Sequence, residues 1–274
     1  ENIIPSNPNH SVGIFYFYHM KIALIQTALH WENPEANRNH IEKLVLSITE
    51  SVDLIVLPEM FSTGFTMNPK DVAETMSSET ITWLQSIAKS KNVAIIGSLV
   101  VKENNQYYNR LVFVFPSGEI EKYDKRHLFT LAGEDKVYTA GKERLIVDYL
   151  GFKICPLICY DLRFPVFSRN TENYDLLLYV ANWPKPRVNA WDILLRARAV
   201  ENQCFVVGVN RLGLDNNNHE YVGHSQAIDF LGNYLLTPQN KEGVFMVTID
   251  KSEMITTRKK LDFLADRDVF SFSE

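Results

Sequence analysis

The sequence predicts an α/β fold built as one domain. Hydrophobic residues make up 46% of its 274 residues and charged residues only 22%, which suits a large core. From Met20 onward, short β-rich runs alternate with longer segments of helical period, as is typical of layered α/β folds. No repeat, low-complexity tract or linker follows residue 20, so nothing marks a second domain. We therefore expect one domain over residues 20–274.

Residues 1–19 are rich in Asn, Pro and Ser, and we interpret them as an upstream extension outside the fold. They lack the basic start and the small residues of a signal peptide. No apolar stretch in the sequence approaches the roughly 18 to 20 residues that span a bilayer.

The individual elements follow from local patterns taken in chain order. Runs rich in Val, Ile, Leu, Phe and Tyr predict strands, and segments with a 3.6-residue period predict helices. A Pro-Ser-Gly turn at 116–118 indicates an antiparallel hairpin, Gly232 and Asn233 indicate another, and the tail from Lys251 begins as a charged helix. The expected strands are 21–27, 53–57, 93–101, 107–115, 119–124, 152–158, 175–180 and 204–209, and the expected helices are 33–50, 78–91 and 187–202.

Charge and cysteine content exclude several classes of function. The formal net charge of -5 offers no basic surface, so we expect neither nucleic acid nor a membrane as a partner. Three cysteines do not make a disulfide framework, which favours a reducing, cytoplasmic setting. Cys155 and Cys159, four residues apart on a strand, would lie about 13 Å apart, too far to share a metal ion. We expect no metal and no cofactor.

Three reactive side chains follow closely after expected strands: Glu59, Lys125 and Cys159. Functional groups of open α/β sheets gather beyond the carboxyl ends of the strands. Taken singly, each residue is more often a loop, surface or packing residue. A carboxylate, an ammonium and a thiol that converge on one crevice, however, are sufficient to attack a carbon bonded to nitrogen.

The chemistry assigns a different task to each group. A thiol with a pKa of about 8.5 is mostly protonated at neutral pH and needs a base, which Glu59 can supply. Lys125 and the backbone N–H of Tyr160 can stabilise the oxyanion. Glu59 would then protonate the departing amine and activate the water that cleaves the thioester.

Two alternatives use other chemistry. In the first, Cys159 pairs with a histidine, either His127 or His224; neither is followed by an obvious orienting group, and Glu59 and Lys125 would be left without a role. In the second, the protein binds an amide-bearing metabolite without turning it over. We expect the other cysteines, Cys155 and Cys204, to be core residues.

Several segments resemble those of the nitrilase (carbon–nitrogen hydrolase) superfamily, from Met20 to about residue 250. The resemblance implies a four-layer α-β-β-α sandwich of the nitrilase type, which packs as a homodimer through its helical layers. It also implies a second glutamate, Glu134, that positions Lys125 and the substrate. The matching segments are "LPEMFSTGF", "YDKRHLF", "CYDLRFPVFSRN", "GEDKVYTAG", "YVANWP", "RARAVENQCFVVGVNR" and "GHSQAIDFLGN".

Within the superfamily, the sequence is most similar to the bacterial ω-amidase branch, which implies hydrolysis of the terminal amide of an α-keto acid such as 2-oxoglutaramate. A carbamoyl amino acid, a nitrile or deaminated glutathione is the alternative substrate. We expect Arg187, just beyond the strand that carries Asn182, to hold the substrate carboxylate. Aromatic residues near the motifs are expected to be partly core and partly pocket wall, namely Phe61, Phe65, Phe129, Tyr160 and Trp183. Among these we expect Phe61, Tyr160 and Trp183, together with Asn182, to contact the substrate.

Overall fold

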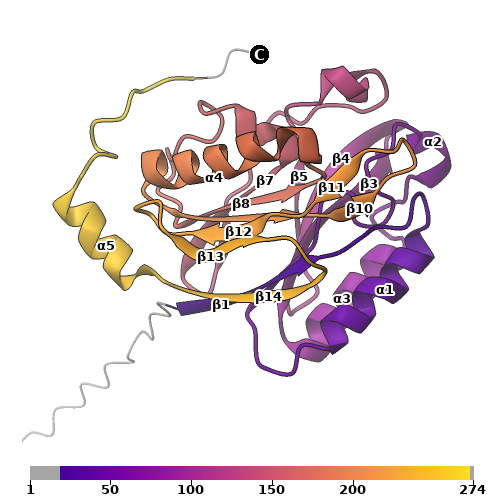
Figure 1. Cartoon of the computed structure of the whole chain (residues 1–274), viewed down its shortest axis with the longest axis horizontal. Helices are drawn as coiled ribbons and strands as arrows, with labels where there is room; N and C mark the ends of the chain where they lie inside the picture. The colour runs from indigo at the N-terminus through magenta and orange to yellow at the C-terminus, as the bar shows by residue number, and fades with distance from the viewer. Residues whose placement is uncertain (1–18, 272–274) are drawn as a thin grey trace, which may run out of the picture.

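Two six-stranded sheets form the centre of the computed structural model, which describes residues 19–271 (Figure 1). In the first sheet the strand order is β14-β1-β2-β3-β4-β5, and in the second it is β13-β12-β9-β8-β7-β6. The first sheet consists of β14 (Gly243–Asp250), β1 (His19–Gln26), β2 (Leu54–Val56), β3 (Ala94–Glu103), β4 (Gln106–Val114) and β5 (Ile120–Asp124). The second consists of β13 (Tyr234–Gln239), β12 (Ser225–Ile228), β9 (Phe205–Asn210), β8 (Leu176–Ala181), β7 (Phe152–Ile158) and β6 (Val147–Tyr149).

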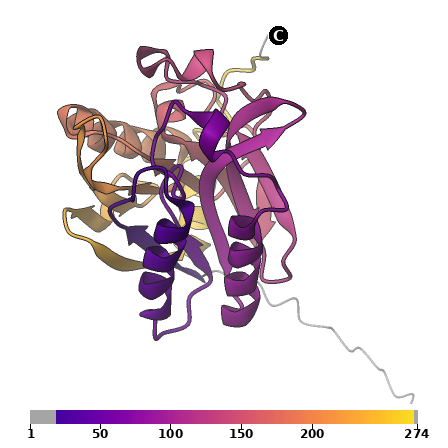
Figure 2. The same ribbon diagram turned by 90° about the vertical axis from the view of Figure 1, so that its right-hand side faces the viewer.

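The helices cover the outer faces of these sheets. The helices α1 (Pro34–Leu46) and α3 (Glu79–Lys91) lie side by side on the first sheet (Figure 2), and α4 (Val188–Asn202) packs on the second. The short α2 (Pro69–Val72) and the charged α5 (Lys251–Lys260), which the tail predicts, complete the α-helices of the described region. The strand β10 (Leu212–Leu214) pairs with β11 (Glu220–Val222). The protein is therefore an α-β-β-α sandwich, as expected.

Alternation along the strands explains why both faces of the first sheet are buried. On β1, Ile22 and Leu24 belong to the core between the sheets, whereas Ala23 and Ile25 belong to the core under α1 and α3. Successive side chains of a strand point to opposite faces, so a sheet covered on both sides needs apolar residues at every position.

Close approach of α4 to the second sheet depends on Gly208 of β9. A Cβ atom at this position would lie 2.6 Å from a methyl carbon of Leu195 and 2.7 Å from the ring of Trp191. Because Gly208 has no side chain, Leu195 and Trp191 can pack directly on the backbone of β9.

Local signals define the helix ends. Ser78 accepts a hydrogen bond from the backbone N–H of Ile81 at the start of α3, and Asn92 adopts a left-handed conformation at its end. The helix predicted over 33–50 ends earlier, at Leu46, because the chain turns at Ser47 to bury Ile48 against the core.

Some strands differ from the prediction. The 107–115 and 119–124 hairpin is confirmed, with Arg110 opposite Asp124 and Val114 opposite Ile120. The strands β6, β10, β11 and β14 were not predicted, and β14 pairs antiparallel with β1 along its full length.

The start of β1 at His19 lies one residue before the expected domain boundary, and residues 1–18, which carry the rest of the predicted extension, lie outside the described residues. Among residues 19–271, no helix combines the length and apolar character that crossing a bilayer requires.

Candidate active site

The side chains of Glu59, Lys125 and Glu134 meet in a buried cluster at the strand ends. Lys125 Nζ lies 2.9 Å from Glu59 Oε1 and 2.9 Å from Glu134 Oε2, and all three residues are buried. Cys159 is half-buried beside them; its Sγ lies 3.9 Å from the carbonyl oxygen of Asn182, and it is close enough to Glu59 for that carboxylate to raise the pKa of the thiol. The structure thus brings together the four residues that the sequence singles out.

The backbone presents these groups at sharp turns. Cys159 follows β7 directly and opens the 3₁₀ helix η3 (Cys159–Arg163), with φ of 42°. Met60, next to Glu59, has φ of 41°. Non-glycine residues are rarely held in this left-handed region, and such conformations persist where the surrounding structure fixes them.

Burial and charge set the protonation of the cluster. Burial alone would lower the pKa of Lys125, but the carboxylates of Glu134 and Glu59 outweigh it and raise that pKa, so the amine stays charged. Burial and the nearby Glu59 hold the pKa of the Cys159 thiol well above its usual range, although Lys125 opposes them. At neutral pH Cys159 is therefore a thiol, which would need a base to act as a nucleophile.

Two asparagines hold the carboxylates in place. Asn109 on β4 donates from Nδ2 to Glu59 Oε1 at 2.8 Å and to Glu134 Oε1 at 3.2 Å. The backbone N–H of Asn182 donates to Glu59 Oε2 at 2.8 Å, and that of Phe129 donates to Glu134 Oε2. Sequence reasoning missed Asn109; a buried polar residue within an apolar strand was the signal that could have found it.

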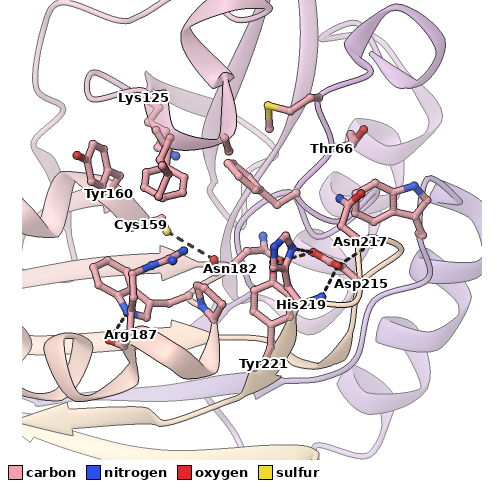
Figure 3. A pocket seen from close by; sticks show the side chains of 18 of the residues that line it. Thr66, Lys125, Cys159, Tyr160, Asn182, Arg187, Asp215, Asn217, His219 and Tyr221 are labelled. Atoms are coloured by element: carbon pink, nitrogen blue, oxygen red, sulfur yellow. Dashed lines mark hydrogen bonds and ion pairs between the residues drawn. The ribbon is translucent and has the colours of Figure 1, made fainter.

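A cavity of about 520 Å³ opens beside the thiol. Figure 3 shows Lys125, Cys159 and Tyr160 on one side of it and Asp215, His219 and Tyr221 on the other. The predicted substrate contacts that line it are Tyr160, Asn182, Trp183 and Arg187, together with Phe65 and Phe129. Lining residues that the sequence analysis did not single out include Trp31, Thr66, Arg163, Asp215, His219 and Tyr221.

Phe61 does not line the cavity, so the expectation that it contacts substrate is wrong. Its N–H donates to the carbonyl of Ser98 on β3, and its ring packs over Gly97, where a Cβ atom would lie 2.9 Å from Phe61 Cδ1. The side chain belongs to the core under α1 and α3 and contacts Trp83. The turn after β2 therefore directs Glu59 inward to the site and Phe61 to the opposite face of the sheet.

Both candidate histidines have carboxylate partners, contrary to the sequence-based expectation. His127 Nδ1 lies 2.7 Å from Asp161 Oδ1, and His224 Nδ1 lies 2.9 Å from Asp192 Oδ2. Among the described residues, the cavity lining includes neither of these imidazoles, whereas the Cys159 thiol lies next to Glu59. This arrangement favours Glu59 as the base.

The remaining cysteines are core residues, as expected. Cys155 and Cys204 are fully buried in the hydrophobic core to which both sheets contribute. Burial raises the pKa of Cys155 to about 12. Across the described part of the chain, no three His, Cys, Asp or Glu side chains gather into a group that could hold a metal ion.

Comparison with known proteins assigns the family. A carbon-nitrogen hydrolase family model matches residues 21–259. The chain is 48% identical over 213 residues to the omega-amidase YafV of Yersinia enterocolitica, covering 78% of this chain and 82% of that protein. It is 35% identical over 250 residues to the 2-oxoglutaramate amidase of Bacillus subtilis, covering 89% and 96%.

Among solved structures, XC1258 from Xanthomonas campestris, a CN-hydrolase superfamily protein with an arsenic adduct in its active site, is 40% identical. It superimposes with a TM-score of 0.91 over 94% of this chain and 100% of its own. The family model and these relatives each span most of the chain, and the protein belongs to the carbon-nitrogen hydrolase family.

Proposed function

We propose that this hydrolase is an ω-amidase that cleaves the terminal amide of a small ω-amido α-keto acid, such as 2-oxoglutaramate, to the acid and ammonia. The observation that carries the proposal is a half-buried thiol beside a buried Glu59 and Lys125, at a cavity that also contains guanidinium groups. The names of the two relatives, omega-amidase and 2-oxoglutaramate amidase, support the substrate class.

The first half of the reaction forms a thioester. Glu59 takes the proton of the Cys159 thiol as sulfur attacks the amide carbon. Negative charge develops on the amide oxygen, and we assign its stabilisation to the ammonium of Lys125 and the backbone N–H of Tyr160. Glu59 then gives its proton to the nitrogen, the carbon–nitrogen bond breaks, and ammonia leaves.

The second half regenerates the thiol. Glu59 removes a proton from a water molecule that attacks the thioester, and the same oxyanion donors act again. The carbon–sulfur bond then breaks, Glu59 returns the proton to the sulfur, and the acid leaves. Glu134, buried and paired with Lys125, fixes the direction of the amine and compensates its charge.

The cavity is lined by two guanidinium groups suited to a carboxylate. Arg187 lies with its Cζ 5.2 Å from the ring centre of Phe129, and Arg163 lies with its Cζ 5.0 Å from that of Trp183. Aromatic faces hold guanidinium groups in place and leave their N–H edges available for a carboxylate. We assign Arg187 as the main contact to the carboxylate end of the substrate.

Replacing Arg187 with methionine is expected to lower kcat/KM for 2-oxoglutaramate about 10²-fold, because the amide carbon loses its attack geometry along with the ion pair. A neutral short amide without the carboxylate should be affected much less. Steady-state kinetics with both substrates make the comparison, and Lys43→Met, which removes an exposed cation on α1 away from the cavity, is the control. An equal loss for both substrates would show that Arg187 has only a structural role.

The reaction itself can be observed directly. Intact-protein mass spectrometry after brief mixing with 2-oxoglutaramate should show a thioester adduct, and ammonia release across a panel of amides should be highest for ω-amido keto acids. Preference for a carbamoyl amino acid, a nitrile or deaminated glutathione would reassign the substrate. Calorimetric binding with no ammonia release would support a metabolite-binding protein.

We also propose that two copies pack as a homodimer through the outer face of α4. Ile193 and Val200, 58% and 53% exposed, lie on this helix, and Val200 borders the turn at Leu231 and Gly232. Exposed apolar residues grouped on one face are typical of protein interfaces.

Light scattering on a size-exclusion column should therefore give a dimer. Val200→Glu should weaken it at least about 10²-fold, because an unpaired charge would be buried in the interface. Leu46→Glu, at an exposed apolar position of α1, should leave it intact. A monomeric unmutated protein would contradict the proposal.

A reducing compartment, the cytoplasm, is the location that we propose. All three cysteines are free thiols, and Cys159 has to remain a thiol to act as the nucleophile.

A further inference from the structure

Asp161, two residues after the nucleophile, is a fully buried carboxylate that accepts four hydrogen bonds. Its Oδ2 accepts from the hydroxyl of Tyr123 at 2.8 Å and from the backbone N–H of Ile158 at 3.0 Å. Its Oδ1 accepts from the backbone N–H of His127 at 3.1 Å and from His127 Nδ1 at 2.7 Å. Four donors to one buried carboxylate compensate its loss of water and fix its position.

These donors come from two segments of the active site. Tyr123 and His127 stand two residues before and two residues after Lys125, whereas Ile158 and Asp161 stand on either side of Cys159. The Tyr123 hydroxyl also accepts the backbone N–H of Arg126 at 3.0 Å, which ties the Lys125 segment together. The ion pairs of Lys125 connect it to the glutamates, but the Asp161 contacts connect its segment to the loop of the nucleophile.

We propose that Asp161, through Tyr123 and His127, is a positioning group that sets the placement of the Lys125 amine relative to the Cys159 thiol. The hydrogen bond from Ile158 also restrains the turn at which Cys159 adopts its left-handed conformation. This positioning role deepens the proposed function and rests on the catalytic pair assigned there.

The His127 side chain makes two kinds of contact: its Nδ1 hydrogen-bonds to Asp161, and its ring stacks on Phe164. A carboxylate oxygen only accepts, so Nδ1 of His127 carries the hydrogen directed to Asp161. The ring stacks on Phe164 with centroids 3.7 Å apart and planes 6° apart, and Phe164 meets the ring of Tyr160 at 5.1 Å. Because the stack does not need the nitrogen, His127→Phe removes the hydrogen bond from the side chain and retains the packing.

Loss of these links should reduce the reactivity of the thiol. The ammonium of Lys125 lowers the pKa of the Cys159 thiol and so opposes the effect of burial. If this ammonium moves away from the sulfur, the pKa rises and a smaller fraction of the thiol is ionised. Displacement by about 1 Å can cost about 10²-fold in rate. Substrate binding at Arg187 does not depend on the Lys125 placement, so the loss falls on kcat.

The test uses two isosteric changes, His127→Phe and Tyr123→Phe, and their combination. Each single variant is expected to lower kcat for 2-oxoglutaramate about 10-fold with KM within about 2-fold, and the combination about 10²-fold. His224→Phe, which breaks a comparable histidine–aspartate pair outside the cavity, should leave kcat unchanged. Asp161→Asn, which keeps one acceptor oxygen, should retain more activity than Asp161→Ala.

A second measurement needs no amide substrate. The rate at which iodoacetamide alkylates Cys159, mapped by peptide mass spectrometry, should fall about 10-fold in His127→Phe and in Tyr123→Phe, and not in His224→Phe. If the unmutated protein hydrolyses no ω-amide and alkylation still slows, the proposed function fails while the positioning role is supported.

Other outcomes would overturn the positioning role. Alkylation and kcat that stay unchanged in both single variants would contradict it, as would a rise in KM with kcat intact. Equal losses in His224→Phe would show general destabilisation instead. Because the two phenylalanine variants keep their ring packing, the outcome does not depend on whether Asp161→Ala folds.

Discussion

Replacing Cys159 with alanine is expected to lower kcat/KM for the ω-amide by at least about 10³-fold. In the proposed mechanism the thiol forms the only covalent bond between the protein and the substrate. No other side chain of the cluster can replace it. The variant should also lose the thioester adduct in intact-protein mass spectrometry.

Cys155→Ala provides the matched control, because Cys155 lies on the same β7 strand, four residues earlier, and is fully buried in the core. It should retain activity and lose some stability from the small cavity left behind. Hydrolysis that survives Cys159→Ala, or disappears in Cys155→Ala while the protein remains folded, would overturn the covalent mechanism.

Glu59→Gln is expected to lower kcat about 10³-fold while substrate still binds, because the change removes the base and keeps the shape. Burial still raises the pKa of the Cys159 thiol in the variant, although the contribution of Glu59 is lost, so without the base most of the thiol stays protonated at neutral pH. Below that pKa, the thiolate fraction rises about tenfold for each pH unit. The residual alkylation of Cys159 in the variant should therefore rise steadily with pH from 7 to 10.

Glu103→Gln is a suitable control for this change, since Glu103 pairs with Arg110 and Lys122 away from the cavity. Glu103→Gln should leave kcat and the pH dependence of Cys159 alkylation unchanged. A mild effect of Glu59→Gln together with a complete loss in His127→Phe would instead favour the cysteine–histidine alternative.

The sequence by itself determined the fold class and singled out the candidate reactive residues. Periods of 2 and 3.6 residues are local properties, so the α/β alternation and most strands could be predicted without knowing how they pair. Glu59, Lys125 and Cys159 follow closely after such strands, and the carboxyl ends of strands are where side chains face a crevice. The strand β14 was missed, although its residues are apolar, and its partner β1 lies more than 200 residues away in the chain.

Only the tertiary structure decided which polar groups meet and which way each side chain faces. Asn109 contacts Glu59 and Glu134 across sequence separations of 50 and 25 residues, and Asp161 reaches His127 across 34. Phe61, two residues from Glu59, faces the opposite side of the sheet because Gly97 leaves room for its ring. Contacts of this kind depend on strand order and on the shape of the neighbouring surface, which local sequence patterns do not encode.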